Sequence, residues 1–392
     1  MATDEKGLMK NENHKEMKRT VRTFAAASFL NDMGSDMIYP VWPLFVTTVL
    51  GANMAILGLI DGLGDAIVSI SQAASGYVSD RTRKRKIFIW TGYTFGSLSR
   101  LGYAFSSVWE HLIPFRILDR AGKMRGAPRD AMIADASTKE TRGRNFGLLR
   151  AMDNLGAFVG IIICVLFVGL LGYRNLFLLA AIPSIIAVAL ILFLIKEKKP
   201  AESKIYKGFS FRGMDRNFRL FTALSAFFAL GSFSYSFLLI YAAQFGFQPI
   251  FVPVLYMIFT FAAFAFSLPF GRLADKIGRK AVIMLSYALW GMVCAGFIFF
   301  QSYLAIIVIF ILYGMHRGAL EPVQKAFVSE LSPEKFRASG LGAYQMVIGL
   351  CALPSSLAAG LLWEAYGMFV PLYLSLGLTV LSLLMLALVH EK

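Results

Sequence analysis

The stretch GYVSDRTRKRK, residues 76–86, holds five Arg or Lys residues in eleven positions and lies between two long apolar runs. A similar stretch, GRLADKIGRKA, begins 195 residues further on, at Gly271. The same offset relates five more pairs: Gly51 and Gly246, Asp135 and Glu330, Arg142 and Arg337, Gly147 and Gly342, Gly172 and Gly367. A constant offset of about half the chain predicts two copies of one unit.

The composition excludes most soluble classes of protein. Hydrophobic residues make up 57% of the chain, charged residues only 16%, and the mean hydropathy is +0.62. The net charge of +15 falls in short clusters between apolar runs, which is typical of membrane topology and excludes nucleic acid as a partner. Cys164, Cys294 and Cys351 lie inside apolar runs, so neither a disulfide nor a metal site is expected.

Apolar runs long enough to cross a bilayer, about 20 residues each, occur twelve times. We place them at 22–49, 53–79, 87–108, 111–136, 144–170, 174–195, 218–244, 248–274, 281–301, 303–329, 338–362 and 368–389. The chain is therefore predicted to be an all-α polytopic membrane protein with two pseudo-symmetric six-helix halves. The predicted parts are a solvated tail at 1–21, a half at 22–195, a linker at 196–217 and a half at 218–392.

Lys and Arg residues between these spans gather on one side of the membrane, with Arg174 the exception. The positive-inside rule makes that side cytoplasmic, so both termini and the linker are expected there, in the plasma (inner) membrane. The first twenty residues are polar and show no cleavable signal peptide.

The two related stretches resemble the signature of the major facilitator superfamily, Gly-x-x-x-Asp-Arg-x-Gly-Arg-Arg, at the turns after spans 2 and 8. The second copy fits well, whereas the first has Arg83 in place of the signature glycine. The residues that match are Gly76, Asp80, Arg81, Gly271, Asp275, Lys276, Gly278 and Arg279. The resemblance covers the whole chain and implies twelve spans, a cytoplasmic linker and transport by alternating access.

The role of these turns has two interpretations. Gly76 and Gly271 would let neighbouring helices approach closely, and Asp80 and Asp275 would cap a helix or pair with an Arg from an adjacent span. The resemblance implies a cytoplasmic gate that holds the outward-open state. The alternative is that the basic residues only set the topology.

Ionisable residues inside the predicted spans are candidates for function, since each costs at least about 2.5 kcal/mol at the bilayer centre. Asp32 and Asp36 are four apart on span 1, as are Asp61 and Asp65 on span 2. At 100° per residue, Arg116, Asp119, Arg120 and Lys123 share one face of span 4, whereas Arg125 and Arg129 point elsewhere. Span 5 adds Arg150, Asp153 and Asn154.

Two interpretations of these charges are open. For Asp32, Asp36, Arg116 and Arg120 we favour a transport cavity. The resemblance implies that helices 1, 2, 4 and 5 are neighbours, so the acids of spans 1, 2 and 5 can meet the bases of span 4. A purely internal network is favoured for a second set, which comprises Asp119, Arg125, Arg129, Asp130 and Asp135. Asp61 and Asp65 fit either interpretation.

The second half is poorer in charge. Span 10 carries His316, Arg317, Glu321 and Lys325, and the spacing predicts an Arg317–Glu321 pair. His316 is more typical of a packing residue than of a titrating one. Hydroxyl and aromatic side chains on spans 7 and 8, such as Ser236 and Tyr256, suit either an organic substrate or ordinary packing.

Two further features resemble the exporters of the superfamily. Arg116 matches an Arg that many proton-coupled members have on span 4. Gly147, Gly156 and Gly160 match the start of the antiporter signature, and they would allow close helix packing. Ile161 then replaces the signature proline, which weakens a drug-antiporter assignment.

These features predict a secondary active transporter, first a proton-coupled exporter of a small organic molecule. Alternatives are an importer of an anionic metabolite, with Arg116 and Arg120 binding its carboxylates, and a transporter of an iron chelate or metal. A receptor or enzyme is disfavoured because no nucleotide loop, zinc motif or Ser-His-Asp set appears. We expect a monomer in the lipid bilayer with no cofactor and no resident metal, driven by the proton gradient.

Overall fold

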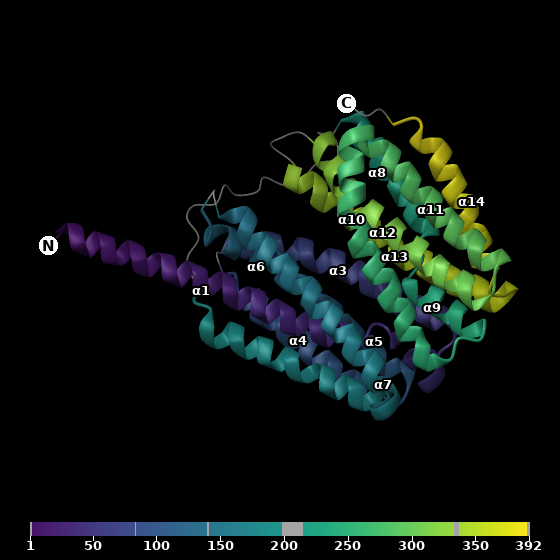
Figure 1. Cartoon of the computed structure of the whole chain (residues 1–392), viewed down its shortest axis with the longest axis horizontal. Coiled ribbons are helices and arrows are strands. Elements are labelled where there is room, and N and C mark those ends of the chain that lie inside the picture. Colours follow the sequence, from purple (N-terminus) through teal and green to yellow (C-terminus); the bar gives the residue numbers. More distant parts are fainter. Residues whose placement is uncertain (1, 83, 139–140, 198–214, 333–336, 390–392) are drawn as a thin grey trace. The chain divides into compact units, whose positions relative to one another are not determined.

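The computed structural model of the chain (Figure 1) describes residues 2–82, 84–138, 141–197, 215–332 and 337–389. These residues form helices and turns and contain no strand, which confirms the all-α class. Seven helices in this part of the chain are long and apolar enough to cross a membrane. The chain forms two compact units, unit 1 (residues 1–39 and 70–206) and unit 2 (40–69 and 207–392). The half boundaries given above stay a prediction.

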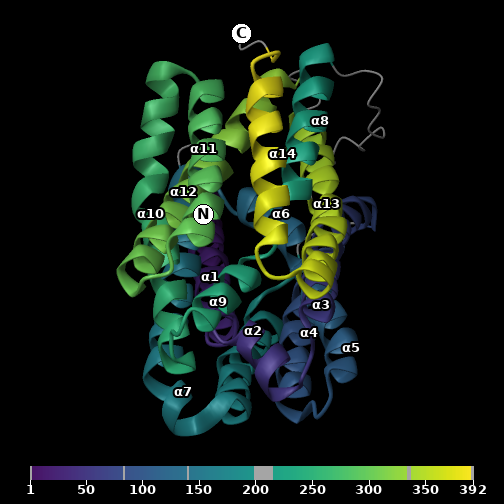
Figure 2. The same ribbon diagram turned by 90° about the vertical axis from the view of Figure 1, so that its right-hand side faces the viewer.

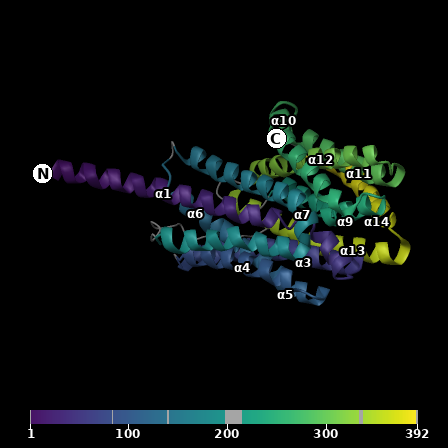
Figure 3. The ribbon, with the colours of Figure 1, turned by 60° about the horizontal axis from the view of Figure 1, so that its bottom comes forward.

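Unit 1 is built around α1 (Ala2–Asp36), α4 (Lys86–Phe105) and α7 (Arg142–Leu194), which pack side by side (Figure 3). α1 runs unbroken from Ala2 into the first predicted span. The tail predicted at 1–21 stays a prediction. One end of the unit holds an apolar cluster that includes Phe24, Ile89 and Ile191.

Two of the predicted spans in the first half are interrupted where glycine and proline occur. Span 1 ends at Asp36, and Pro40 and Pro43 precede the short α2 (Trp42–Leu44) and a π-helix, η1 (Phe45–Val49). After η2 (Trp109–His111), span 4 forms α5 (Leu112–Ala121), a 3₁₀ segment, η3 (Gly122–Arg125), and α6 (Gly126–Asp135). Spans 5 and 6 together form α7, which turns at Gly172. α3 (Met54–Thr82) passes from unit 2 into unit 1.

Unit 2 holds α2, η1 and the first part of α3 with the later helices (Figure 2). These are α8 (Arg216–Gly231), α9 (Tyr235–Gln244), η5 (Pro249–Phe251), α10 (Val252–Ile277), α11 (Arg279–Phe299), α12 (Tyr303–Leu331), α13 (Arg337–Tyr366) and α14 (Val370–Leu386). Span 7 is divided into α8 and α9. The interior is aromatic: the rings of Phe228 and Tyr287 stack with centroids 3.7 Å apart, and Trp290 is fully buried.

The sequence repeat is visible in the backbone. Gly51 and Gly246 have φ angles of 69° and 95°, and Gly172 and Gly367 have φ angles of 70° and 96°. Left-handed backbone of this kind favours glycine, so the paired glycines occupy equivalent turns. Gly278, at the signature position of the second copy, has a φ of 97°. Its counterpart Arg83 lies outside the described residues.

The glycines predicted to bring helices together divide into two groups. Gly156 and Gly160 on α7 face the backbone carbonyls of Phe29 and Met33 on α1, where no Cβ would fit, so their packing role is confirmed. Gly147 and Gly271 have no described atom within 4 Å of a Cβ position, and the packing role of these two stays a prediction. At Gly76, a Cβ would make only an ordinary 3.4 Å contact with Ala127.

Candidate transport site

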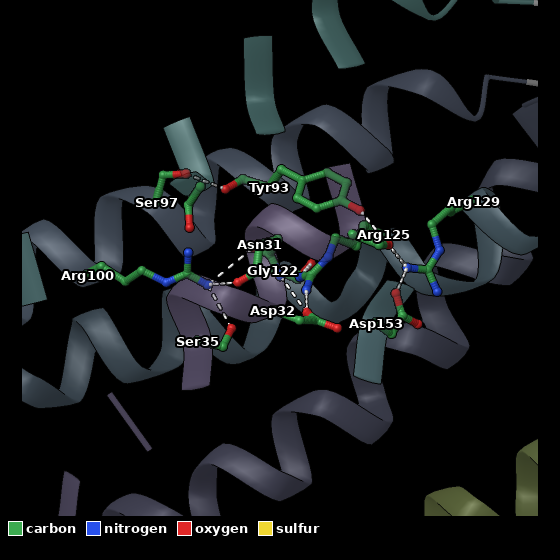
Figure 4. A network of polar contacts seen from close by, with 12 residues as sticks. Asn31, Asp32, Ser35, Tyr93, Ser97, Arg100, Gly122, Arg125, Arg129 and Asp153 are labelled. Carbon is green, nitrogen blue, oxygen red and sulfur yellow. Dashed lines mark hydrogen bonds and ion pairs between the residues drawn. The ribbon is translucent and has the colours of Figure 1, made fainter. Parts of the chain in front are cut away.

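The polar interior of unit 1 centres on Asp32 of α1 (Figure 4). Asn31 donates from Nδ2 to Asp32 Oδ1 over 2.9 Å, and Nη2 of Arg125 lies 3.9 Å from the same oxygen. The Asp32 side chain is 25% exposed, whereas that of Arg125 is 7% exposed. A carboxylate that solvent can reach, beside a buried cation, can exchange a proton or contact a solute.

The 3₁₀ segment η3, which interrupts span 4, fixes the position of Arg125. Its Nη1 donates to the Gly122 carbonyl at the start of η3 over 2.9 Å, and its guanidinium lies 4.8 Å from the ring centroid of Tyr93. Glycine at positions 92 and 122 lets α4 approach this segment closely. The sequence argument placed Arg125 in a purely internal network, but the structure brings it to Asp32.

A second acid–base group continues the network. Arg129 on α6 donates from Nη1 to Ser28 Oγ over 2.5 Å and lies 3.8 Å from Asp153 Oδ1. Arg150 lies 3.4 Å from the other oxygen of Asp153. Ser28 and the Tyr93 hydroxyl are 3.2 Å apart, which connects this group to the surroundings of Arg125. Asp153, predicted as a site residue, therefore belongs to the same network as Asp32.

Arg100 on α4 is a buried cation that the sequence argument missed. Its Nη2 donates to Ser35 Oγ over 2.7 Å and to the carbonyl and side-chain oxygens of Asn31 over 3.0 and 3.2 Å. Arg100 thereby orients Asn31, which in turn binds Asp32. The sequence does contain a signal for Arg100. It is an ionisable residue in the middle of the predicted span 87–108, and such residues inside span 4 were treated as candidates for function.

The other residues predicted for the first half lie beside this network. Arg116 and Asp119 on α5 are both buried, and Nε of Arg120 lies 3.7 Å from Asp119 Oδ2. The Arg120 guanidinium also lies 5.2 Å from the ring centroid of Tyr39. Asp36 is the last residue of α1. The expected pairing of Asp36 with these arginines stays a prediction.

In unit 2 the predicted residues form a smaller group. The Arg317–Glu321 ion pair is confirmed, with the side chains 44% and 52% exposed. Asp65 lies on the part of α3 that belongs to unit 2. His316 is 1% exposed and lies 3.0 Å from Ser286 Oγ, as expected of a packing residue.

Asp61, which the sequence left open, is buried in unit 2. The indole nitrogen of Trp42 donates to Asp61 Oδ1 over 2.9 Å, and the hydroxyl of Ser234 donates to Oδ2 over 2.7 Å. Ser236 also donates to Oδ2. Ser234 is the N-cap of α9 and Ser236 lies in its first turn, so Asp61 connects the first part of α3 to the start of α9.

Each basic turn forms an ion pair with an acidic residue at the end of the fourth predicted span of its copy, which is Asp135 on α6 in the first copy and Glu330 on α12 in the second. Arg279 lies 3.0 Å from Asp275 and 2.5 Å from Glu330, whereas Arg85 pairs with Asp135. Lys276 and Arg81 are exposed, and Arg81 lies 3.4 Å from the Tyr77 hydroxyl. The side chain of Asp80 lies outside the described residues. The structure thus gives Asp275 the predicted arginine partner.

Helices long and apolar enough to cross a membrane, together with charged residues buried inside unit 1, are typical of a multi-pass membrane protein. The sequence model of the Major Facilitator Superfamily matches residues 24–248 and 219–392. The chain therefore belongs to the Major Facilitator Superfamily, as the turn signature predicted.

Three known proteins illustrate the relationship. The chain is 38% identical to a protein of Methanocaldococcus jannaschii described as an uncharacterized MFS-type transporter, covering 97% of this chain and 98% of the other. It is 26% identical to citrate exporter 1 of Aspergillus niger, over 44% of this chain and 32% of that one. The crystal structure of the nucleoside transporter NupG matches with a TM-score of 0.76 at 16% identity, covering 94% and 98% of the chains.

Proposed function

We propose that this transporter exports a small organic solute in exchange for protons, and that Asp32 carries the proton. The observation behind this proposal is the contact between the partly exposed carboxylate of Asp32 and the buried guanidinium of Arg125. Protonation removes one charge of this pair, and deprotonation restores it. Movement that changes the exposure of Asp32 would then couple proton release to solute movement.

Export is favoured over import by one comparison, the partial similarity to a citrate exporter. Asp153 supports Asp32, because it is the next carboxylate in the same network and also lies beside an arginine. Asp36, four residues after Asp32 on α1, is the third candidate.

Import of an anionic metabolite or an iron chelate is the second candidate function. Arg116 and Arg120 favour it, because two guanidinium groups on one helix, one buried and one 11% exposed, attract carboxylates. In that case the solute, rather than a proton, would approach the arginines of α5.

The experiment uses purified protein in proteoliposomes. A thermal-shift screen with organic acids, nucleosides and dipeptides selects a solute, and its flux is then measured with a pH gradient imposed in either direction. Export in exchange for protons predicts that solute moves against its gradient toward the acidic compartment. Accumulation in the opposite compartment supports proton-coupled import, and flux indifferent to pH contradicts both proposals.

The orientation is part of the proposal. We propose that both termini and the 196–217 linker are cytoplasmic, because Lys and Arg gather on that side. In a cysteine-free background, Lys196→Cys should be protected from a membrane-impermeant thiol reagent in intact cells, while Leu304→Cys should react. Reaction of Lys196→Cys from outside would reverse the orientation.

A further inference from the structure

A basic groove lies outside the polar network of unit 1, along the N-terminal part of α1 and the C-terminal end of α7. Its volume is about 410 Å³. The described residues that line it are Lys15, Lys18, Arg19, Arg22, Thr23, Ala26, Leu190 and Leu194. Four of these carry a positive charge and none carries a negative one.

The four cations form a single stripe. Lys15, Lys18, Arg19 and Arg22 are spaced i, i+3, i+4 and i+7, so their side chains share one face of α1. All four side chains are exposed, and their positive charges converge on one wall of the groove. A wall of this kind binds phosphate oxygens by charge-assisted hydrogen bonds.

The opposite wall is apolar and continues toward the surface that faces lipid. Leu190 and Leu194 are one helical turn apart on α7. The same helix exposes Ile182, Ile186 and Phe193, the last with 83% of its surface accessible. In a membrane protein such a face contacts acyl chains, so the groove joins a cationic wall to a hydrocarbon-facing one.

Two described acidic residues lie close to the groove in the sequence or the fold but do not line it. Glu197 accepts the backbone N–H groups of Arg85 and Lys86 over 2.9 and 2.8 Å, and it does not line the groove. Glu16 follows Lys15 on α1 but is not among the lining residues. Positive-inside topology accounts for basic residues on this side, but it does not require a hollow between them.

We infer that this groove binds the headgroup of an anionic phospholipid, with the phosphate on the α1 stripe and an acyl chain along Leu190 and Leu194. Clusters of four or more basic residues beside a transmembrane helix attract anionic lipids, and basic pockets between such helices bind their headgroups. The groove combines both features in one place.

The test is native mass spectrometry of the full-length protein in detergent, with phosphatidylglycerol or phosphatidylcholine of the same acyl chains. The wild type should retain one phosphatidylglycerol at least tenfold more tightly than phosphatidylcholine. The groove variant replaces four residues, Lys15→Gln, Lys18→Gln, Arg19→Gln and Arg22→Gln, and should lose that preference. A matched control removes four exposed arginines elsewhere, Arg142→Gln, Arg144→Gln, Arg216→Gln and Arg219→Gln, and should bind within twofold of the wild type.

Two further variants separate charge from folding and from the apolar wall. Exchanging Lys for Arg, and Arg for Lys, at the four groove positions should preserve binding. Leu190→Gln with Leu194→Gln should weaken phosphatidylglycerol binding without a change in charge.

Two results would overturn the inference. Equal losses in the groove and control variants would mean that net charge alone attracts the lipid. Complete competition by soluble glycerophosphoglycerol at the same concentration would assign the groove to a free phosphate ester rather than a lipid.

Discussion

The two copies of the repeat keep the same turns but have different interiors. The 195-residue offset pairs glycines of positive φ in both copies, and it pairs Asp135 with Glu330, each of which binds an arginine of its own basic turn. Inside the membrane, the same offset takes Asp32 to Phe227, Arg125 to Leu320 and Asp153 to Ile348. The geometry of the turns is thus common to both copies, whereas the ionic network of Asp32, Arg125, Arg129 and Asp153 occurs in the first copy alone among the described residues.

The difference indicates which part of the repeat is needed for folding and which for transport. The helical turns require glycine and acid–base pairs wherever the six-helix unit occurs. A buried ionic network carries a desolvation cost, and apolar residues at the equivalent positions of the second copy avoid it. We therefore expect changes to the network to affect coupling, and changes to the turns to affect stability equally in both copies.

The largest expected effect tests whether coupling belongs to the first copy. Asp32→Asn keeps the shape of the side chain but removes the carboxyl group proposed to carry the proton, so pH-gradient-driven accumulation should fall to background. Exchange of solute down its own gradient should continue, because binding does not need that proton. Both modes are measured as flux in proteoliposomes.

Glu321→Gln is the matched control, since it also removes one carboxylate from an arginine pair, but in unit 2. We expect it to lower gradient-driven flux by less than about threefold, because this pair is half-exposed and contributes little. Full coupling in Asp32→Asn with loss in Glu321→Gln would move the proton site to unit 2.

The second effect concerns the stability of the ionic pair. Arg125→Leu introduces the residue found at the equivalent position of the second copy and leaves Asp32 without this cation. Removing one partner of a fully buried pair costs roughly 3–5 kcal/mol, and the partial exposure of Asp32 lowers our expectation to about 2 kcal/mol.

The double variant Arg125→Leu with Asp32→Asn should recover most of that loss, because no charge is left unpaired. Denaturation in detergent measures both variants. An equal loss in the single and double variants would show that Arg125 stabilises the unit through Tyr93 and Gly122 rather than through Asp32.

The third effect should be the same in both copies. Gly172→Ala and Gly367→Ala each place a Cβ on backbone of positive φ, at a cost of about 1–3 kcal/mol. No described atom lies within 4 Å of either Cβ position, so the cost comes from the backbone alone. Gly147→Ala is the control, since its site is equally open but helical, and it should be neutral or slightly stabilising. Clearly unequal losses at Gly172 and Gly367 would contradict the equivalence of the two turns.

The fold followed from the sequence because apolar runs, basic clusters and paired glycines are local signals. The pairing of Asp32 with Arg125 did not follow, because the face assignment assumed a regular helix with 100° per residue. The segment Gly122–Arg125 is a 3₁₀ helix, which advances about 20° more per residue. That extra rotation moves Arg125 away from the face predicted for it. Arg100 was missed for another reason. A charged residue inside a span is costly to insert into the bilayer and is therefore a candidate for function, but this rule was not applied to the single arginine of the span 87–108.

The smallest expected effect on stability concerns the gate turn of the second copy. Asp275→Asn removes the carboxylate that lies 3.0 Å from Arg279, while Glu330 remains 2.5 Å away. Asp275 is 65% exposed, so the pair contributes at most about 0.5 kcal/mol, and the denaturation midpoint should be almost unchanged.

If the turn is a gate, transport should nevertheless fall severalfold in vesicles that contain normal amounts of protein. Glu330→Gln, which removes the other acid from the same arginine, should have the same effect on flux. Normal flux in both variants would leave the basic turn with a role in topology alone, and the resemblance of the two turns would then reflect folding rather than gating.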